Sequence, residues 1–151
     1  NFTRNRMMKN IPKSVKLISS LGLIPFFLGV IGTIRLNIFD TSTNIFFVEI
    51  SILYSGLILS FLGGCLFGFE TLSNPVPKKT ALWIAIVPTI WALLALQIPN
   101  FKASAMAIGF LVLFEFDRRA SRTETTPLWW IKLRLPLTCC VIVSLAIIGF
   151  S

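Results

Sequence analysis

Residues 54–70 read YSGLILSFLGGCLFGFE, and this stretch decides the fold. Small residues recur in it at every fourth position, and no charged side chain appears before Glu70. A segment of about 20 apolar residues is long enough to cross a bilayer as a helix. Helices associate in lipid where small side chains let two backbones approach closely. The stretch therefore predicts a membrane-spanning helix with a packing stripe, formed by Gly56, Ser60, Gly64 and Gly68 and widened by Gly63.

The glycines in this stripe also allow a second interpretation, a helix that lines a pore or a substrate path. Such paths carry charged side chains at membrane depth, and the stripe has none. We therefore expect this helix to lie centrally in a bundle and to serve packing. Gly29 and Gly32 in the preceding apolar run offer a partner surface, and Pro25 is expected to bend that run.

The composition of the whole chain supports a membrane location. Of 151 residues, 55% are hydrophobic and 13% are charged, and the mean hydropathy is +0.83. Soluble domains carry roughly 25% charged residues. The sequence predicts an all-α membrane protein, a single bundle of five transmembrane helices preceded by a basic N-terminal segment at 1–16. The transmembrane domain covers 17–151, with spans at about 17–34, 45–69, 81–96, 103–116 and 131–150.

Lysine and arginine are unequally distributed between the two ends of the predicted spans. Twelve of the fourteen lie in the N-terminal segment, in the loop at 70–80 or between 118 and 134, whereas the opposite ends hold only Arg35 and Lys102. Basic loops remain on the cytoplasmic side of a membrane, so the N-terminus is expected on the cytoplasmic or matrix side. Three tryptophans near the basic ends fit the same orientation, because indole rings favour the interface: Trp83, Trp129 and Trp130.

The six acidic residues leave few possible ion pairs at the membrane surface. Arg134 lies just inside the fifth predicted span, where an unpaired charge is costly. We predict structural ion pairs, one of them between Arg35 and Glu49 on the sparsely charged side. The alternative, a proton or ion relay, lacks both a mid-membrane carboxylate and any histidine. The predicted cluster on the basic side comprises Glu70, Glu115, Asp117, Arg118 and Arg134.

Residues that carry catalytic or metal chemistry are scarce. The chain has no histidine, and Cys65, Cys139 and Cys140 all lie within apolar runs. No phosphate-binding loop, zinc-protease motif or nucleophile elbow is present. The basic residues are scattered at helix ends instead of forming one face with stacking aromatics, which argues against nucleic acid. We expect no catalytic, cofactor or metal site and no enzymatic activity, but we do expect bound structural lipids.

Three stretches of the chain carry a resemblance to a known family. They are IPKSVKLISSLGLIPFFLGV at 11–30, YSGLILSFLGG at 54–64 and LRLPLT at 133–138. With these stretches the chain resembles the DUF3429 family, which includes the TMEM69-like proteins. The resemblance implies a small polytopic protein of about five helices, found in bacterial membranes and in mitochondria. It implies no established biochemical activity.

Size and composition limit the possible functions. Five helices with little mass outside the membrane leave little room for an independent active site. We expect a non-catalytic structural or accessory subunit of a larger inner-membrane complex, respiratory or otherwise energy-converting. The alternative is a small transporter or channel, whose polar path would depend on Tyr54, Ser55, Ser60 and the carboxylates at the helix ends. A mitochondrial inner membrane is favoured over a bacterial one, because Asn1 in place of a methionine suggests upstream processing.

Overall fold

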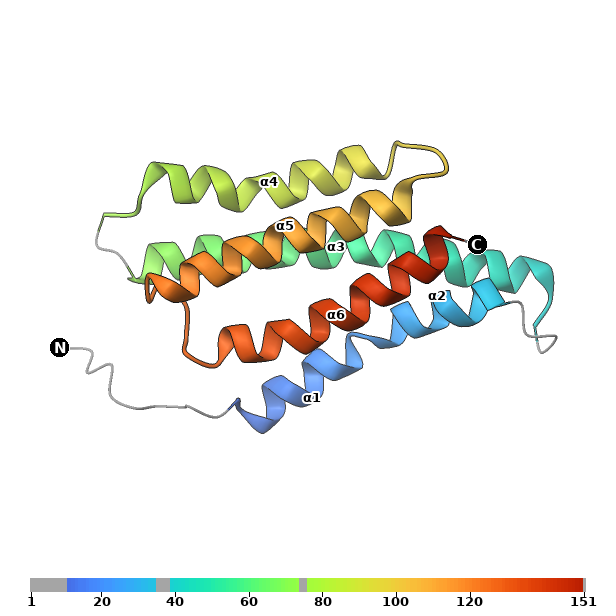
Figure 1. The fold of residues 1–151 in the computed structure, drawn as a ribbon, viewed down its shortest axis with the longest axis horizontal. Coiled ribbons are helices and arrows are strands. Elements are labelled where there is room, and N and C mark those ends of the chain that lie inside the picture. Colours follow the sequence, from blue (N-terminus) through green and yellow to red (C-terminus); the bar gives the residue numbers. More distant parts are fainter. Residues whose placement is uncertain (1–10, 35–38, 74–75, 151) are drawn as a thin grey trace.

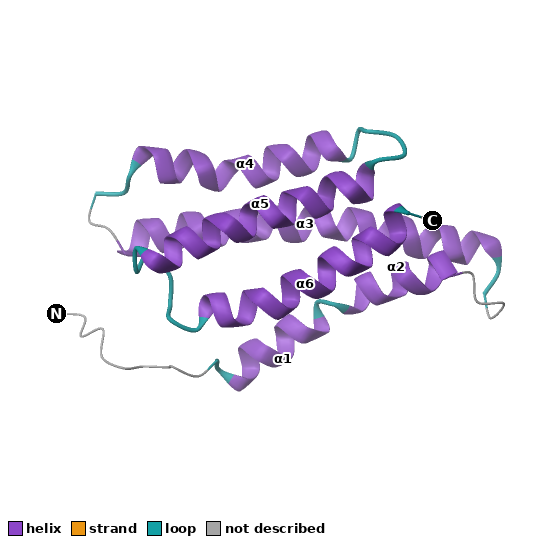
Figure 2. Cartoon of the chain, in the orientation of Figure 1, coloured by secondary structure: helices purple, strands orange, loops and turns teal. Residues whose placement is uncertain are grey.

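The structure is a computed structural model that describes residues 11–34, 39–73 and 76–150. In Figure 1 the helices lie side by side along the long axis of the molecule, and α1 and α2 follow one another as a single broken rod. Every regular element of the described residues is a helix (Figure 2). Their bounds are α1 Lys13–Leu21, α2 Ile24–Ile34, α3 Thr41–Ser73, α4 Lys79–Ala95, α5 Lys102–Arg122 and α6 Trp130–Gly149.

The first predicted span is not one continuous helix. It breaks at Gly22 and Leu23, between α1 and α2. Pro25 explains the break, because it has no backbone N–H to donate to the carbonyl of Leu21 and its ring crowds that carbonyl. The Leu23 N–H instead donates to the Ser20 carbonyl oxygen at 3.1 Å, a tighter turn than that of an α-helix.

Helix α3 is much longer than the predicted span at 45–69. It has 33 residues and a length of about 50 Å, compared with about 30 Å for the hydrocarbon core. Its first turn follows Asp40, whose carboxylate accepts hydrogen bonds from the hydroxyls of Ser42 and Thr43. These two hydrogen bonds lower the pKa of Asp40 from its usual value. An ionised carboxylate at this position is favourable, because the N-terminus of a helix carries partial positive charge.

Length and hydropathy support an all-helical membrane protein. Within the described residues, three segments are long and apolar enough to cross a bilayer, namely Lys13–Ile34, Thr41–Ser73 and Trp130–Gly149. Helix α4 is apolar but has only 17 residues. Helix α5 has 21 residues and is longer than the predicted span at 103–116, because the charged residues that follow Phe116 continue the helix.

Helix α3 occupies the central position that the sequence predicted. It packs against α2 along its first half, against α4 along its second half, and against α5, while α6 covers α5 and α2. Fully buried side chains from four helices meet there, among them Phe26, Leu59, Met106, Phe110 and Leu145. The bundle is therefore held by one element that contacts most of the others.

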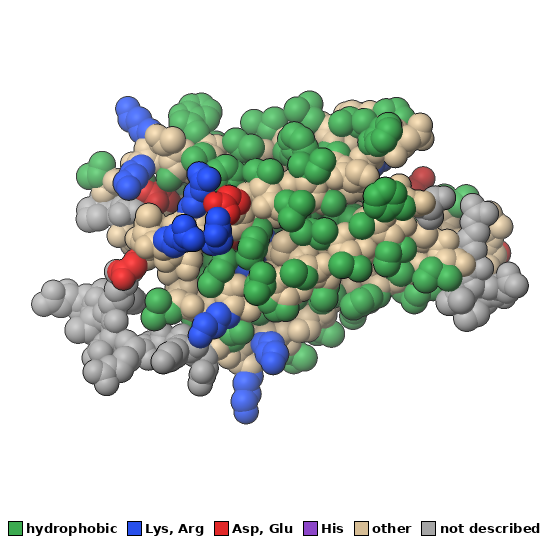
Figure 3. All heavy atoms as spheres, viewed as in Figure 1, with side chains coloured by type: hydrophobic (Ala, Val, Ile, Leu, Met, Phe, Trp, Pro, Cys, Tyr) green, Lys and Arg blue, Asp and Glu red, His purple; other side chains and the backbone are tan. Residues whose placement is uncertain are grey.

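The surface of the molecule is apolar along its sides and basic at one end. Figure 3 shows hydrophobic side chains over the helices, with Lys and Arg side chains gathered at the left end. The C-terminus of α5 and the N-termini of α4 and α6 meet at that end (Figure 1). Exposed large apolar residues occur on all six helices, which suits a chain surrounded by lipid.

Candidate functional site: a buried arginine–aspartate pair

Arg134 and Asp117 form an ion pair in the interior of the bundle. The Arg134 Nε donates to Asp117 Oδ2 at 2.8 Å, and the two side chains are only 5% and 1% exposed. The second carboxylate oxygen, Oδ1, accepts a hydrogen bond from the Trp130 indole Nε1 at 2.7 Å. Both oxygens of Asp117 are thus occupied, which offsets the cost of burying its charge.

The local sequence explains how these three residues meet. Trp130 and Arg134 lie four positions apart on α6, so their side chains share one face of the helix. The short connection between α5 and α6 makes the two helices antiparallel neighbours and brings Asp117 opposite that face. The Trp130 ring also packs edge-on against Phe69 of α3, with ring centroids 4.9 Å apart. The ion pair therefore joins α5 to α6, and the Trp130 ring adds a contact with α3 at the basic end of the bundle.

The other predicted members of the basic-side cluster lie elsewhere. Glu115 is on the exterior of α5, where it bonds Arg118 at 2.7 Å and Arg119 at 2.9 Å. Glu115 and Asp117 are two positions apart, about 200° around a helix, and so point to opposite sides. The prediction of a single cluster is therefore wrong.

Glu70 is buried at the end of α3. Its Oε1 accepts a hydrogen bond from the backbone N–H of Lys78 at 3.0 Å, which ties the end of α3 to the start of α4. The predicted pair on the other side of the membrane stays a prediction, because Arg35 lies outside the described residues. Its proposed partner Glu49 is exposed on α3.

The packing stripe on α3 divides into a buried part and an open part. A Cβ atom added to Gly63 would lie 2.5 Å from the Ala85 carbonyl oxygen of α4, and one added to Gly56 would contact α4 and α5. Gly64 and Gly68 are different, since an added Cβ would have no other heavy atom of the described chain within 4 Å. The prediction that these two glycines pack within the bundle is wrong.

The geometry of an α-helix explains this correction. A repeat of four residues drifts by about 40° at each step around a helix of 3.6 residues per turn. The stripe that begins at the buried Gly56 has therefore turned outward by Gly64. Ser60 lies between the two, half-buried, and donates its hydroxyl to the Gly56 carbonyl oxygen at 3.0 Å.

Gly29 and Gly32 of α2 do face α3, but they contact its first half. An added Cβ on Gly29 would lie 2.5 Å from the Cβ of Ser51, and one on Gly32 would lie 2.5 Å from the Asn44 carbonyl oxygen. The stripe at residues 56–68 is therefore not their partner surface. Close backbone approach between these helices requires glycine at both positions of α2.

The chemistry available at the buried pair is limited. A guanidinium stays protonated in proteins, so Arg134 can hold an anion but cannot carry a proton. Two buried polar atoms on this face of α6, Arg134 Nη2 and Thr138 Oγ1, have no hydrogen-bond partner among the described residues. In those same residues no group of three or more His, Cys, Asp or Glu side chains could hold a metal ion.

The sequence predicts Trp130 only as an interfacial anchor, whereas the structure places its indole at this site. Its spacing of four residues from Arg134 was the one available signal that the two side chains share a partner. Sequence reasoning also missed the contact of Trp91 with α5, where Nε1 donates to the Ala105 carbonyl oxygen at 2.8 Å. No spacing in the sequence indicates that bond, since the two residues lie on different helices.

Comparison with known proteins identifies the family of this chain. The model of a family described as a protein of unknown function, DUF3429, matches residues 11–150. The chain belongs to the DUF3429 family. Transmembrane protein 69 of Xenopus tropicalis is 29% identical to this DUF3429 chain over 150 residues, covering 93% of the chain and 55% of the relative. The chain thus spans about half the length of that relative. No solved structure matches it.

Proposed function

We propose that this DUF3429 protein is a non-catalytic structural or accessory subunit of a larger inner-membrane complex, respiratory or otherwise energy-converting. The observation that carries the proposal is the open part of the α3 stripe. Ser60, Gly64 and Gly68 follow one another at intervals of four residues on its outer side, and neither glycine has a packing partner within the described chain.

Glycine at such positions needs an explanation. In a helix it is less favourable than alanine by about 1 kcal/mol, and at Gly64 and Gly68 no contact with the described part of the chain offsets that cost. Small residues spaced by four let another helix approach the backbone closely in lipid. Leu57 and Phe61 flank the stripe and are 68% and 66% exposed, so a partner helix would also cover them. A helix of another subunit is the occupant that these features suit.

The proposed setting is an inner membrane that the chain crosses five times. The unequal charge of the two ends supports an orientation with the basic end on the matrix or cytoplasmic side. The mitochondrial inner membrane is proposed ahead of the bacterial cytoplasmic membrane. Within the complex, the outer side of α3 would bind its neighbour, and the buried Arg134–Asp117 pair would hold the bundle rigid.

Gentle detergent extraction followed by native electrophoresis tests the subunit proposal. The wild-type chain is expected to migrate with a large stable assembly. Gly64→Leu should release it from that assembly without changing its thermal unfolding. Val143→Leu, which adds apolar bulk on the exposed side of α6, serves as the control and should stay in the assembly.

Two results would contradict the proposal. One is a wild-type chain that migrates as a discrete small oligomer and moves a solute across liposomes, as a transporter or channel would. The other is an equal loss from the assembly for Gly64→Leu and Val143→Leu, which would show that the α3 stripe has no special part in binding.

A further inference from the structure

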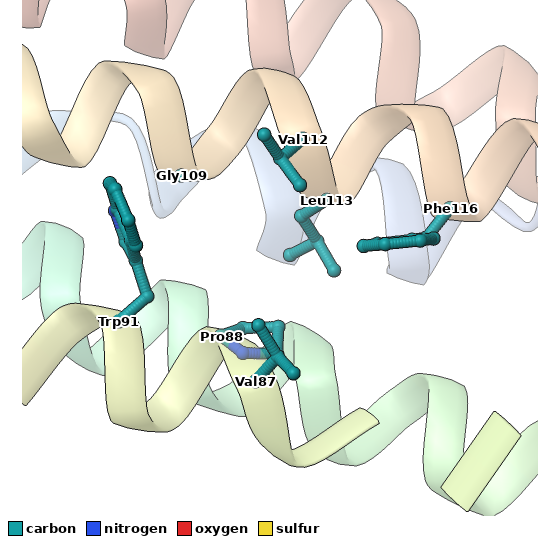
Figure 4. Close-up of a pocket in the computed structure, with 7 residues that line it drawn as sticks. All are labelled: Val87, Pro88, Trp91, Gly109, Val112, Leu113 and Phe116. Atoms are coloured by element: carbon teal, nitrogen blue, oxygen red, sulfur yellow. The ribbon is translucent and has the colours of Figure 1, made fainter. Parts of the chain in front are cut away.

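Helices α4 and α5 are consecutive in the chain but pack against each other only weakly. Helix α4 packs mainly on α3, and α5 packs mainly on α6. A cavity of about 250 Å³ lies between them. Figure 4 shows side chains from both helices around it. Its lining is apolar and includes Val87, Pro88 and Trp91 from α4, with Gly109, Val112 and Phe116 from α5.

A second cavity of about 220 Å³ continues the first toward the basic end, and Phe116 lines both. Its lining changes character, from the apolar Ala81 and Ile84 to the polar side chains of Glu70, Lys78 and Arg119. Together the two cavities form what we call the α4–α5 crevice. The crevice is therefore apolar at one end and polar at the other.

Trp91 closes the apolar end of the crevice. Its indole bonds the Ala105 carbonyl oxygen of α5 at 2.8 Å, and its ring lies over Gly109, where an added Cβ would be 2.7 Å from the ring. From Trp91 to Lys78 the crevice follows 13 residues of α4, or about 20 Å. One leaflet of a bilayer with its headgroups is also about 20 Å thick. The crevice thus has the length of a single lipid.

Charge at the polar end favours an anion. The cations there are Lys78 and Arg119 in the crevice, with Lys79, Arg118 and Arg122 next to them in the helices. Against these five cations stand three carboxylates, Glu70, Glu115 and Glu124, the last of them between the lining residues Thr123 and Thr125. Glu70 already accepts a hydrogen bond from the Lys78 backbone, and Glu115 accepts hydrogen bonds from Arg118 and Arg119. An excess of positive charge therefore remains at headgroup level.

We propose that the α4–α5 crevice binds one phospholipid with an anionic headgroup. An acyl chain occupies the apolar end between Val87 and Val112, and the phosphate lies between Lys78 and Arg119. A partner helix does not fit, because a helix with its side chains is about 10–12 Å across and the crevice is a narrow space of two small cavities. Basic pockets between helices at the cytoplasmic or matrix side are suited to anionic headgroups.

Native mass spectrometry of the purified full chain tests this proposal. The chain is mixed with phosphatidylglycerol or with phosphatidylcholine of identical acyl chains, and the bound fraction is measured. Wild-type protein is expected to retain one phosphatidylglycerol in preference to phosphatidylcholine. Lys78→Gln and Arg119→Gln should each lower that preference about fivefold, the ratio expected for one basic residue at an anionic surface. Lys102→Gln removes a charge at the opposite end of α5 and serves as the control, which should leave the preference for phosphatidylglycerol unchanged.

A second pair of variants separates the crevice from the general lipid surface. Val112→Trp fills the apolar end and should abolish retention of both lipids, whereas Leu111→Trp adds the same side chain on the exposed side of α5 and should retain them. Equal binding of the two lipids by the wild-type chain would overturn the proposal. So would a photoreactive residue at Val112 that crosslinks a second copy of the chain and no lipid.

Discussion

Two adjacent glycines of α3, Gly63 and Gly64, have opposite surroundings. A Cβ atom added to Gly63 would lie 2.5 Å from a backbone oxygen of α4, whereas a Cβ atom added to Gly64 would meet open space. Gly63→Ala should therefore destabilise the bundle by about 1–3 kcal/mol, the usual cost of overpacking. Gly64→Ala should be neutral or slightly stabilising, because alanine favours a helix. Thermal unfolding of both variants in detergent measures the difference.

The matched pair controls for the change in helix propensity, which is the same at both positions. A similar loss of stability at Gly63 and Gly64 would contradict the packing seen here. It would mean that α3 is rotated, so that both glycines face a neighbour.

Arg134 and Asp117 give the second prediction at this scale. Arg134→Leu leaves the Asp117 carboxylate buried with only the Trp130 hydrogen bond, a situation that costs about 3–5 kcal/mol in buried pairs. The variant should accumulate to a lower level in the membrane and unfold at a lower temperature. The double variant Arg134→Leu, Asp117→Leu should recover much of the loss, because no buried charge remains. Immunoblotting of membranes and thermal unfolding in detergent are the measurements.

Normal abundance and normal thermal stability of Arg134→Leu would refute a structural role for the pair. A functional role would then be the better explanation. Failure of the double variant to exceed either single variant in stability would also contradict the assignment, because the loss would then come from packing and not from an uncompensated charge.

The sequence identified Arg134 but not its partner. An arginine inside an apolar run needs a carboxylate, and that requirement is visible without a structure. Which carboxylate satisfies it depends on the rotation of α5, since Glu115 and Asp117 point to opposite sides of the same helix. Rotation is set by packing across the bundle, which a linear pattern does not contain. The helix repeat predicts that Gly56 and Gly64 point in different directions. It does not predict which of the two directions faces the bundle.

At the scale of the elements, Pro25 controls the break between α1 and α2. In Pro25→Ala the new N–H can donate to the Leu21 carbonyl, so α1 and α2 should join into one helix. Amide exchange of residues 22–26 should slow, as measured by hydrogen–deuterium exchange in detergent. Pro12→Ala, just before α1, should leave that exchange unchanged. Unaltered exchange in Pro25→Ala would show that packing around Gly22, and not the proline, ends α1.

Hydropathy predicted where helices exist better than where they end. The apolar run at 103–116 predicts a short span, whereas α5 continues to Arg122. Glutamate and arginine are good helix formers, so the helix extends past the apolar residues. Helix α3 is extended at its start by Asp40 and its hydrogen bonds with Ser42 and Thr43. Helix ends depend on such local contacts, and hydropathy does not report them.

At the scale of the whole molecule, the proposed five-span topology would place Ser42 and Thr123 on opposite sides of the membrane. A chain in which the three native cysteines are replaced by serine should therefore give opposite results for Ser42→Cys and Thr123→Cys. Only Thr123→Cys should react from the matrix or cytoplasmic side with a membrane-impermeant thiol reagent. The assay is labelling of intact membranes or mitoplasts. Labelling of both cysteines from the same side would rule out the topology.

A helical bundle could be predicted from the sequence, because the lengths of the apolar segments, the charges of the loops and the turn residues all indicate helices that lie side by side. The crevice between α4 and α5 could not. The crevice forms because α4 packs mainly on α3 while α5 packs mainly on α6. The sequence of one helix alone does not show which neighbour it packs on. Trp91 and Gly109 look like ordinary apolar residues of separate helices until the structure places one over the other.

The buried pair has a consequence for how the chain is made. Asp117 lies on α5, and Arg134 follows it 17 residues later on α6. While the ribosome is still synthesising α6, the carboxylate of Asp117 has no cation from that helix, and α5 alone is poorly apolar. We therefore expect α5 to pack stably only after α6 has been synthesised, because a chain that ends before residue 134 leaves the Asp117 carboxylate without its arginine.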